Sequence, residues 1–309
     1  MDTRAVVLAD AFAADAAGGL PVAVLPDGSD LSDTQLRTVA REFAAPATAV
    51  PTGGPPGSLR AVGPDGPAGA RTVAVAAVAV AAERGWLDAA GGTDHELPVA
   101  GTPHEVTAAA DGRAWVDTPE PDPRSAAVDP EAVSEALAVP LPALRDVGAD
   151  LPPVRVTGAV DALAVPVNFL EHLGAATPDP AALADLAGLA DVAAVCAFTF
   201  DTLGADAACH ARTFVPPHRD GADDEGPWVR DRRHEVPAAP TVAAGVATHL
   251  VREGVIGDEF PIVECGHYLD RPGQVHADPE TLRVGGRATV TVDGTVTVPP
   301  DDDEDIVEL

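Results

Sequence analysis

The chain has 309 residues, enough for two ordinary domains, and carries 49 acidic residues against 19 basic ones, all of them arginine. Its net charge of −30 argues against nucleic acid, because phosphate contacts require clusters of Lys and Arg, and against anionic membrane surfaces. The acidic residues are spread along the whole chain, which we interpret as adaptation to molar intracellular salt, where self-repulsion is screened. An acidic protein from a GC-rich mesophile explains arginine in place of lysine, but not so large a charge.

Other protein classes are also disfavoured. Met1–Arg4 lacks a signal-peptide pattern, and no apolar run reaches about 18 residues without a charge or a helix-ending signal. Cys196, Cys209 and Cys265 are widely spaced and form no CxxC motif, so neither a zinc site nor a disulfide framework is indicated. We expect a soluble, cytoplasmic protein without a metal or other cofactor.

Strand and helix signals alternate through the first half of the chain. Ala5–Ala9 and Val22–Leu25 read as strands on either side of a Gly18-Gly19 turn. Ser32 is expected to cap a helix that ends near Phe43, with its apolar residues on one face. The other strands predicted in this half are Ala47–Val50, Leu97–Val99, His104–Thr107 and Arg113–Val116, the last two joined by an Asp111-Gly112 turn.

Two apolar segments read as copies of one helix. Thr72–Gly85 and Thr241–Gly254 each open on a threonine, and a glycine follows thirteen residues later. Threonine is a favoured N-cap, and glycine just past the last turn ends a helix in the left-handed conformation. Alternating valines in the first segment also fit a strand, but fourteen unbroken residues favour a helix. Because almost nothing between the ends is polar, both helices are expected to be buried on all sides.

Alternate prolines in residues 118–124 predict an extended linker, because proline cannot lie in a central strand or a helix interior. The second half then predicts helices at Pro130–Leu137 and Pro180–Leu189 and strands near Val154–Val156, Ala162–Val167, Val192–Phe200 and Ala211–Phe214. Arg283–Val296 is expected to form a hairpin with an Asp293-Gly294 turn. Each half thus has several strands around one apolar helix, which predicts an α+β protein built twice. The expected domains are residues 1–117 and 125–298, whose last strands cross back to the first domain, followed by an acidic tail at 299–309.

Short motifs recur in a fixed order along nearly the whole chain, although each is weak by itself. They are Asp10-Ala11-Phe12, Gly18–Val24, Leu31-Ser32-Asp33, Arg212–Pro216, Arg271-Pro272-Gly273, and Val284–Val290 with Gly294. In these motifs the chain resembles the PhzF-like isomerase family, which shares the diaminopimelate-epimerase fold. The resemblance implies two similar domains, each a barrel-like, mostly antiparallel or mixed sheet around one central apolar helix. It also implies a ligand site in the cleft where both helix N-termini point.

Such a site makes physical sense for a small carboxylate-bearing metabolite. A helix N-terminus presents free N–H groups and a partial positive charge, which stabilise an anion. A positioned carboxylate could then move a proton at a neighbouring carbon.

The acid–base residues of the family are replaced at three positions. Ala47 stands where the family has its glutamate, Ala70 where it has a histidine, and Val236 where it has an aspartate. The neighbouring Thr48 and Pro237 match the family motifs and support this alignment.

The resemblance assigns substrate contacts to Thr48, Gly69, Arg71, Thr72 and Thr241. Arg71 could instead pair with a surface carboxylate. A charged insertion at residues 218–234 reads as a solvated loop or as a lid that brings His234 and Glu235 in as replacement acid and base. Cys209-His210 and Cys265-Gly266-His267 look like thiol–imidazole pairs, but structural buried cysteines are the simpler interpretation.

Three hypotheses follow. The chain is a diverged isomerase acting on a small carboxylate-bearing molecule, a non-catalytic member of the family that keeps the fold for ligand binding or as a partner subunit, or an enzyme of different chemistry using His234, Glu235 or Arg71. A homodimer is a further expectation.

Overall fold

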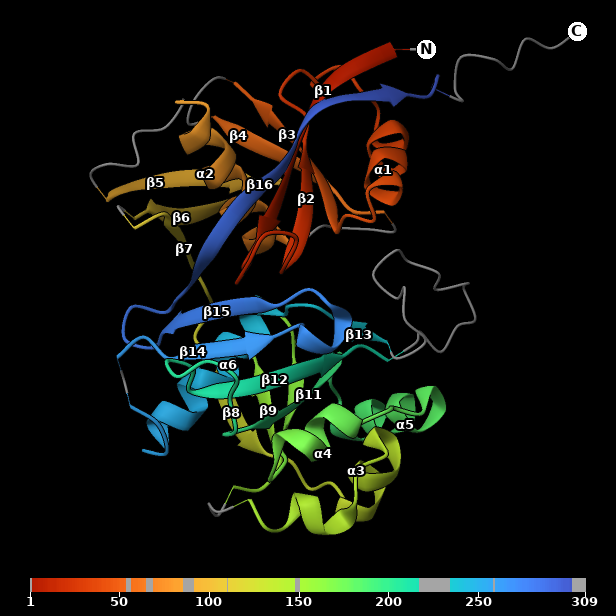
Figure 1. Cartoon of the computed structure of the whole chain (residues 1–309), viewed down its shortest axis with the longest axis vertical. Helices are drawn as coiled ribbons and strands as arrows, with labels where there is room; N and C mark the ends of the chain where they lie inside the picture. The colour runs from red at the N-terminus through yellow and green to blue at the C-terminus, as the bar shows by residue number, and fades with distance from the viewer. Residues whose placement is uncertain are drawn as a thin grey trace, which may run out of the picture. The chain divides into compact units, whose positions relative to one another are not determined.

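The computed structural model describes residues 2–53, 57–64, 69–85, 92–109, 111–147, 151–216, 234–257 and 259–301. Its contacts divide the chain into two units, shown in Figure 1. Unit 1 comprises residues 1–116 and 287–309, and unit 2 comprises residues 117–286. The charged insertion lies outside the described residues except for His234, and so does the acidic tail from residue 302 onward.

Eight strands in the described part of unit 1 form a closed, barrel-like sheet. Neighbours follow the order β1 to β7, and β16 pairs with both β7 and β1, which closes the circuit. Most pairs are antiparallel, whereas β2–β3 and β4–β5 are parallel. The strands are β1 (Asp2–Ala11), β2 (Leu20–Val24), β3 (Ala47–Thr52), β4 (Ser58–Val62), β5 (Thr93–Val99), β6 (Thr102–Ala108), β7 (Arg113–Asp117) and β16 (Arg283–Val298).

Helix α2 (Ala70–Glu83) packs against β1, β2, β3 and β5. Its residues from Thr72 to Val78 are buried, whereas Ala79, Ala81 and Ala82 are half-buried, so the predicted all-round burial is confirmed only for the first two turns. Gly85 follows the last turn with φ +67°, as predicted for a glycine that ends a helix. The predicted N-cap is wrong: the N-cap is Gly69, three residues before Thr72, and Thr72 lies inside the first turn.

Helix α1 (Asp33–Glu42) covers the opposite face of β2, β3 and β4. Ser32 caps it as predicted, accepting a hydrogen bond from the backbone of Gln35 while the Gln35 side chain accepts one from the Ser32 backbone. Leu36 and Val39 pack with residues that include Leu25, Val50 and Val62 in a separate core.

Unit 2 contains an open sheet of the same mixed kind. The strand order is β8-β9-β10-β11-β12-β14-β15-β16, with β13 paired to β12. The pairs β10–β11 and β12–β14 are parallel. The strands are β8 (Asp122–Ser125), β9 (Val154–Thr157), β10 (Ala162–Pro166), β11 (Ala194–Thr199), β12 (Cys209–Phe214), β13 (Glu235–Val236), β14 (Ile262–Cys265) and β15 (Gly273–Asp278).

Helix α6 (Pro240–Arg252) packs against β9, β14 and β15 and is buried from Val242 to Leu250. A Cβ at Gly245 would lie 2.6 Å from Val156 Cγ1, so glycine lets the helix approach β9 closely. Gly254 follows the helix with φ +69°. Here too the threonine is not the cap, because the helix begins at Pro240 after Ala239, and Thr241 lies in the first turn.

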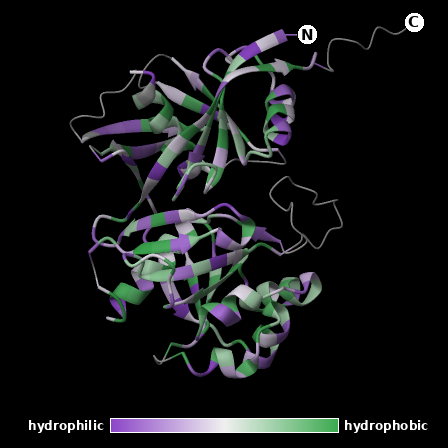
Figure 2. Ribbon diagram, viewed as in Figure 1, coloured by the Kyte–Doolittle hydropathy of each residue, from purple (hydrophilic) through white to green (hydrophobic). Residues whose placement is uncertain are grey.

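The other face of this sheet is covered by α3 (Pro130–Leu137), α4 (Leu170–Ala175) and α5 (Pro180–Ala190). Val165, Val195 and Phe214 project from the strands into a core with these helices. Figure 2 shows hydrophobic and hydrophilic residues alternating along many strands of both units.

The two units repeat one topology. In each, a parallel strand pair precedes an antiparallel pair, and the next parallel pair spans the central helix. Two further antiparallel strands complete each repeat, β6 and β7 in unit 1 and β15 and β16 in unit 2. The α+β fold of two similar units, each with a barrel-like mixed sheet around one apolar helix, is therefore as predicted.

Two local predictions fail. Arg283–Val298 is one continuous strand rather than a hairpin, because β1 pairs with it through Asp293 and Gly294. Within the predicted linker 118–124, Asp122 and the residues after it form β8. Proline is tolerated there because β8 is an edge strand.

Candidate functional site

The N-terminal end of α2 carries features that favour an anion. Its N-cap is Gly69, which has no side chain to accept from the first-turn N–H groups. The first turn holds no acidic residue. Thr72 is buried and Arg71 is half-buried within this turn. The helix dipole is therefore not offset by an N-cap oxygen or an acidic first-turn side chain.

The N-terminal end of α6 is built in the same way. Ala239 is the N-cap and offers no side-chain acceptor, and Pro240 at the first helical position has no N–H. The first hydrogen bond within the helix is the one from the Ala243 N–H to Ala239 O, at 2.8 Å. The N–H groups of Thr241 and Val242 precede it and have no acceptor within the helix. No acidic residue lies in this first turn either.

Ala47 and Thr48, two of the predicted site positions, are neighbours on β3 and point to opposite faces of the sheet. Successive side chains on a strand point to opposite faces, so Thr48 shares a face with Val50, which packs in the α1 core. Ala47 therefore faces the α2 side. Both residues are completely buried, and the Thr48 hydroxyl has no hydrogen-bond partner within the described part of the chain.

Strand β13 separates Glu235 from Val236 in the same manner. Glu235 lies opposite Phe214 and Val236 lies opposite Thr213. Phe214 packs in the core with α3 and α5, so Glu235 points to that side. Val236, where the resemblance places the family aspartate, points to the α6 side. The carboxylate of Glu235 is therefore on the wrong face to replace the missing aspartate.

Glu235 is moreover held in a buried ion pair. Its two oxygens accept hydrogen bonds from Arg212 Nε at 3.0 Å and from a terminal Arg212 nitrogen at 2.6 Å, and both side chains are fully buried. A bidentate pair of this kind is strong and planar. It leaves Glu235 poorly suited to exchange protons with a ligand.

His234 is half-buried and adopts a left-handed backbone conformation, with φ +52°. Its carbonyl accepts a hydrogen bond from the Val215 N–H at 2.8 Å. The lid that would bring it to a ligand lies outside the described residues.

The cysteines do not pair with histidines. All three are buried, and burial raises the thiol pKa to about 11 at Cys196 and about 12 at Cys265. Cys209 and His210 are neighbours on β12 and so point to opposite faces. Structural thiols are therefore the right interpretation.

His210 belongs instead to a buried polar cluster that the sequence does not reveal. Its Nδ1 lies 3.3 Å from Glu264, whose carboxylate also accepts from the N–H groups of Leu203 at 2.9 Å and Gly204 at 2.6 Å. The ring of His267 is 5.0 Å from that of His210. Burial, together with the nearby His267, lowers the pKa of His210 to about 4. Because His210 has no exposed surface, this cluster is structural.

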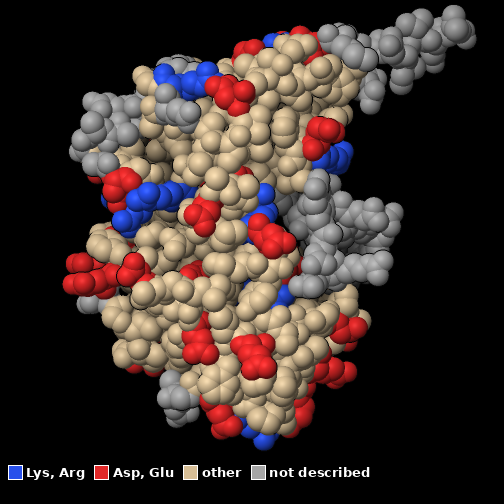
Figure 3. Space-filling model, in the orientation of Figure 1, with Lys and Arg blue, Asp and Glu red and all other residues tan. Residues whose placement is uncertain are grey.

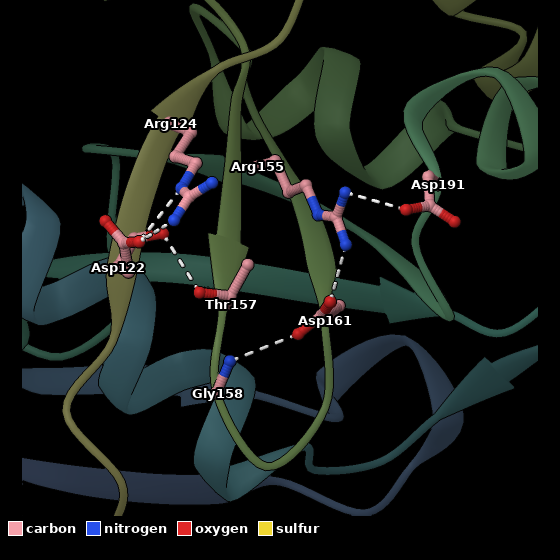
Figure 4. A network of polar contacts seen from close by, with 7 residues as sticks. All are labelled: Asp122, Arg124, Arg155, Thr157, Gly158, Asp161 and Asp191. Atoms are coloured by element: carbon pink, nitrogen blue, oxygen red, sulfur yellow. Dashed lines mark hydrogen bonds and ion pairs between the residues drawn. The ribbon is translucent and has the colours of Figure 1, made fainter.

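Figure 4 shows a second polar network, on β8, β9 and the turn into β10. Arg155 binds Asp161 at 2.7 Å and Asp191 at 2.9 Å, and Asp161 also accepts from the Gly158 N–H at 3.2 Å. The Arg155 guanidinium holds the pKa of Asp161 below its usual value. Every cation in it has a carboxylate partner, so the network ties strand ends together rather than forming a ligand site.

Two general findings bear on the class of site. Within the described ranges, no group of three or more His, Cys, Asp or Glu residues is arranged to hold a metal ion. None of the helices in those ranges is both long and apolar enough to cross a membrane.

Comparison with known proteins adds the family. The family model described as phenazine biosynthesis-like protein matches residues 9–298. The chain belongs to this family. No curated protein matches the chain.

Solved structures show the same fold. A PhzF-family phenazine biosynthesis protein from Bacillus anthracis superposes with a TM-score of 0.77 at 18% identity, covering 96% of this chain and 100% of that one. A predicted epimerase from Pseudomonas aeruginosa gives 0.72 at 21% identity, with the same coverage. A hydroxyproline epimerase from Agrobacterium vitis, with bound trans-4-hydroxy-L-proline, gives 0.50 at 13% identity, covering 95% of this chain and 92% of that one.

Proposed function

We propose that this member of the phenazine biosynthesis-like family binds a small carboxylate-bearing molecule at the N-terminal end of a central helix, α2 or α6, and that it has lost carboxylate-based proton transfer. The uncapped first turns, free of acidic residues, support the binding part. The ligand of the structurally similar hydroxyproline epimerase carries a carboxylate, which supports the same class. The contacts of Gly69, Arg71, Thr72 and Thr241 stay predictions, whereas Thr48 is completely buried on the face of β3 that packs against α1.

The loss of proton transfer is carried by one observation. Glu235 is the carboxylate next to the family aspartate position. It points away from α6, and both of its oxygens accept hydrogen bonds from Arg212. Ala47, Ala70 and Val236 cannot supply a proton at the three family positions.

The test is solvent exchange at carbon. The protein is incubated in D₂O and molar potassium chloride with trans-4-hydroxy-L-proline and a panel of small amino and hydroxy acids, and deuterium at the α-carbon is followed by NMR. We expect saturable binding of at least one carboxylate by titration calorimetry and no exchange above the protein-free rate.

Two outcomes would contradict the proposal. Exchange above the protein-free rate would show that proton transfer survives and would restore the isomerase hypothesis. Failure of every carboxylate to bind would remove the ligand-binding role and favour a partner subunit.

A further inference from the structure

Arg212 is the largest fully buried side chain in the described part of the chain, and its polar contacts fall into two groups. One side of the guanidinium binds both oxygens of Glu235. The remaining terminal nitrogen donates to the last carbonyls of α4, at 2.7 Å to Leu173, 3.3 Å to Gly174 and 3.0 Å to Ala176. Leu173 O also accepts the Ala176 N–H at 3.3 Å, and the Arg212 cation adds a side-chain cap to this helix end.

Two aromatic rings complete the environment of this cation. The guanidinium carbon lies 5.0 Å from the ring centroid of Phe214 and 4.8 Å from that of Tyr268. Tyr268 also donates to Leu170 O at 3.4 Å. The position of Arg212 is therefore determined by β12, α4 and the aromatic contacts together, which makes it a firm anchor for Glu235.

Glu235 is the first residue of the short segment that leads from β13 into α6. Only Pro237, Ala238 and Ala239 separate β13 from the helix. Gly266 packs closely against this segment, because a Cβ there would lie 2.7 Å from Pro237 O. Gly266 has φ +73°, so only glycine is comfortable there. The turn is thus held at Glu235 and closely packed at Pro237, immediately before the N–H groups of Thr241 and Val242.

We propose that Arg212 is a positioning residue: through Glu235 it fixes the turn 235–239 and so sets the direction of the free N–H groups at the start of α6. The role in ligand binding rests on the function proposed above. This role gives Glu235 a structural function next to Val236, where the family acid is replaced. In this role Glu235 fixes the turn before α6 and does not contact the ligand.

The test compares hydrogen exchange in two segments that share Arg212. In molar potassium chloride, Glu235→Gln keeps the cap on α4 but weakens the anchor of the turn. We expect amide exchange in residues 237–243 to accelerate by about tenfold while residues 170–176 are unchanged. Arg212→Lys should accelerate both segments, because lysine lacks the planar fork. Arg155→Lys, which alters a partly buried ion pair elsewhere in the same unit, should change neither.

Equal acceleration of both segments in Glu235→Gln, or no acceleration at 237–243, would overturn the positioning role. If Glu235→Gln does not fold, Glu235→Asp decides by the same comparison, because it keeps the charge but shortens the reach.

A separate arm titrates trans-4-hydroxy-L-proline. We expect Glu235→Gln to weaken its binding about tenfold, as loss of preorganisation does, and Arg155→Lys to leave it unchanged. If the wild-type protein binds no carboxylate, the proposed function fails, while the exchange experiment still decides the positioning role.

Discussion

The buried ionisable residues of unit 2 are held by different means. Arg212 and Glu235 neutralise each other, whereas His210 has only a long contact to Glu264 and stays neutral because burial disfavours its charge. Removing one partner of a buried pair typically costs about 3–5 kcal/mol, because the other charge is left uncompensated. Glutamine and alanine at position 235 both leave the Arg212 charge uncompensated, but glutamine keeps an oxygen that can accept from Arg212, so Glu235→Ala is expected to be the more disruptive.

The histidine makes stability depend on pH. The pKa of His210 is about 4 in the folded chain against an ordinary 6.5, so the unfolded chain takes up a proton first as pH falls. The contribution is fully present above pH 6.5 and is lost progressively between 6.5 and 4, by up to about 3 kcal/mol. Denaturant unfolding in molar salt at pH 7.5 to 4 measures it. His210→Gln should flatten this part of the profile, and an unchanged slope in the variant would contradict the assignment.

At the scale of elements, helices with a clear face or cap agree with their predictions. Local periodicity and end signals place α1, α3 and α5 within one residue at each end. Strands β4, β8, β13, β14 and β15 and the six-residue α4 are missed. These segments are short or rich in proline and charge, and they become regular only by pairing with distant strands.

Residue 294 in β16 allows a test of whether this segment is a continuous strand or turns at Asp293-Gly294. Gly294 lies within the strand without a positive φ, and a Cβ there would meet nothing within 4 Å. Gly294→Thr should therefore stabilise the protein by about 0.5–1 kcal/mol, since threonine is a better strand residue. Denaturant unfolding of the variant against wild type measures the change. A loss of stability would favour the Asp-Gly turn, which requires φ above zero.

At the scale of the whole molecule, acidic surface is the dominant feature. Figure 3 shows Asp and Glu side chains scattered over the viewed face rather than gathered in one patch. With a net charge of −30, the carboxylates of the folded chain repel one another, and dissolved salt shortens the distance over which this repulsion acts. Halophilic adaptation remains our proposal for this pattern.

Salt should therefore stabilise the fold strongly. The screening length falls from roughly 10 Å at 0.1 M to roughly 3 Å at 1 M salt, so mutual repulsion of the carboxylates is relieved. We expect the Tm to rise by at least roughly 5 °C between these concentrations of potassium chloride, as followed by circular dichroism. An equal osmolality of a non-ionic solute is the control. A flat response to salt would rule out the halophilic interpretation.

Some properties were determined by the sequence alone. The apolar segments at Thr72–Gly85 and Thr241–Gly254 predict two buried helices and a duplicated α+β chain, because composition and helix-ending glycines act within a few turns. The loss of acid–base residues at Ala47, Ala70 and Val236 rests on the family resemblance and stays a proposal.

Only the tertiary structure decided what Glu235 does and whether Asp293-Gly294 turns. Both outcomes depend on partners far along the chain, Arg212 and β1, whose pairing overrides the local preference. The N-caps at Gly69 and Ala239 were likewise visible only in the tertiary structure. A threonine near a helix end is a cap only if the preceding backbone leaves the helix there, and in both units the chain enters the helix earlier.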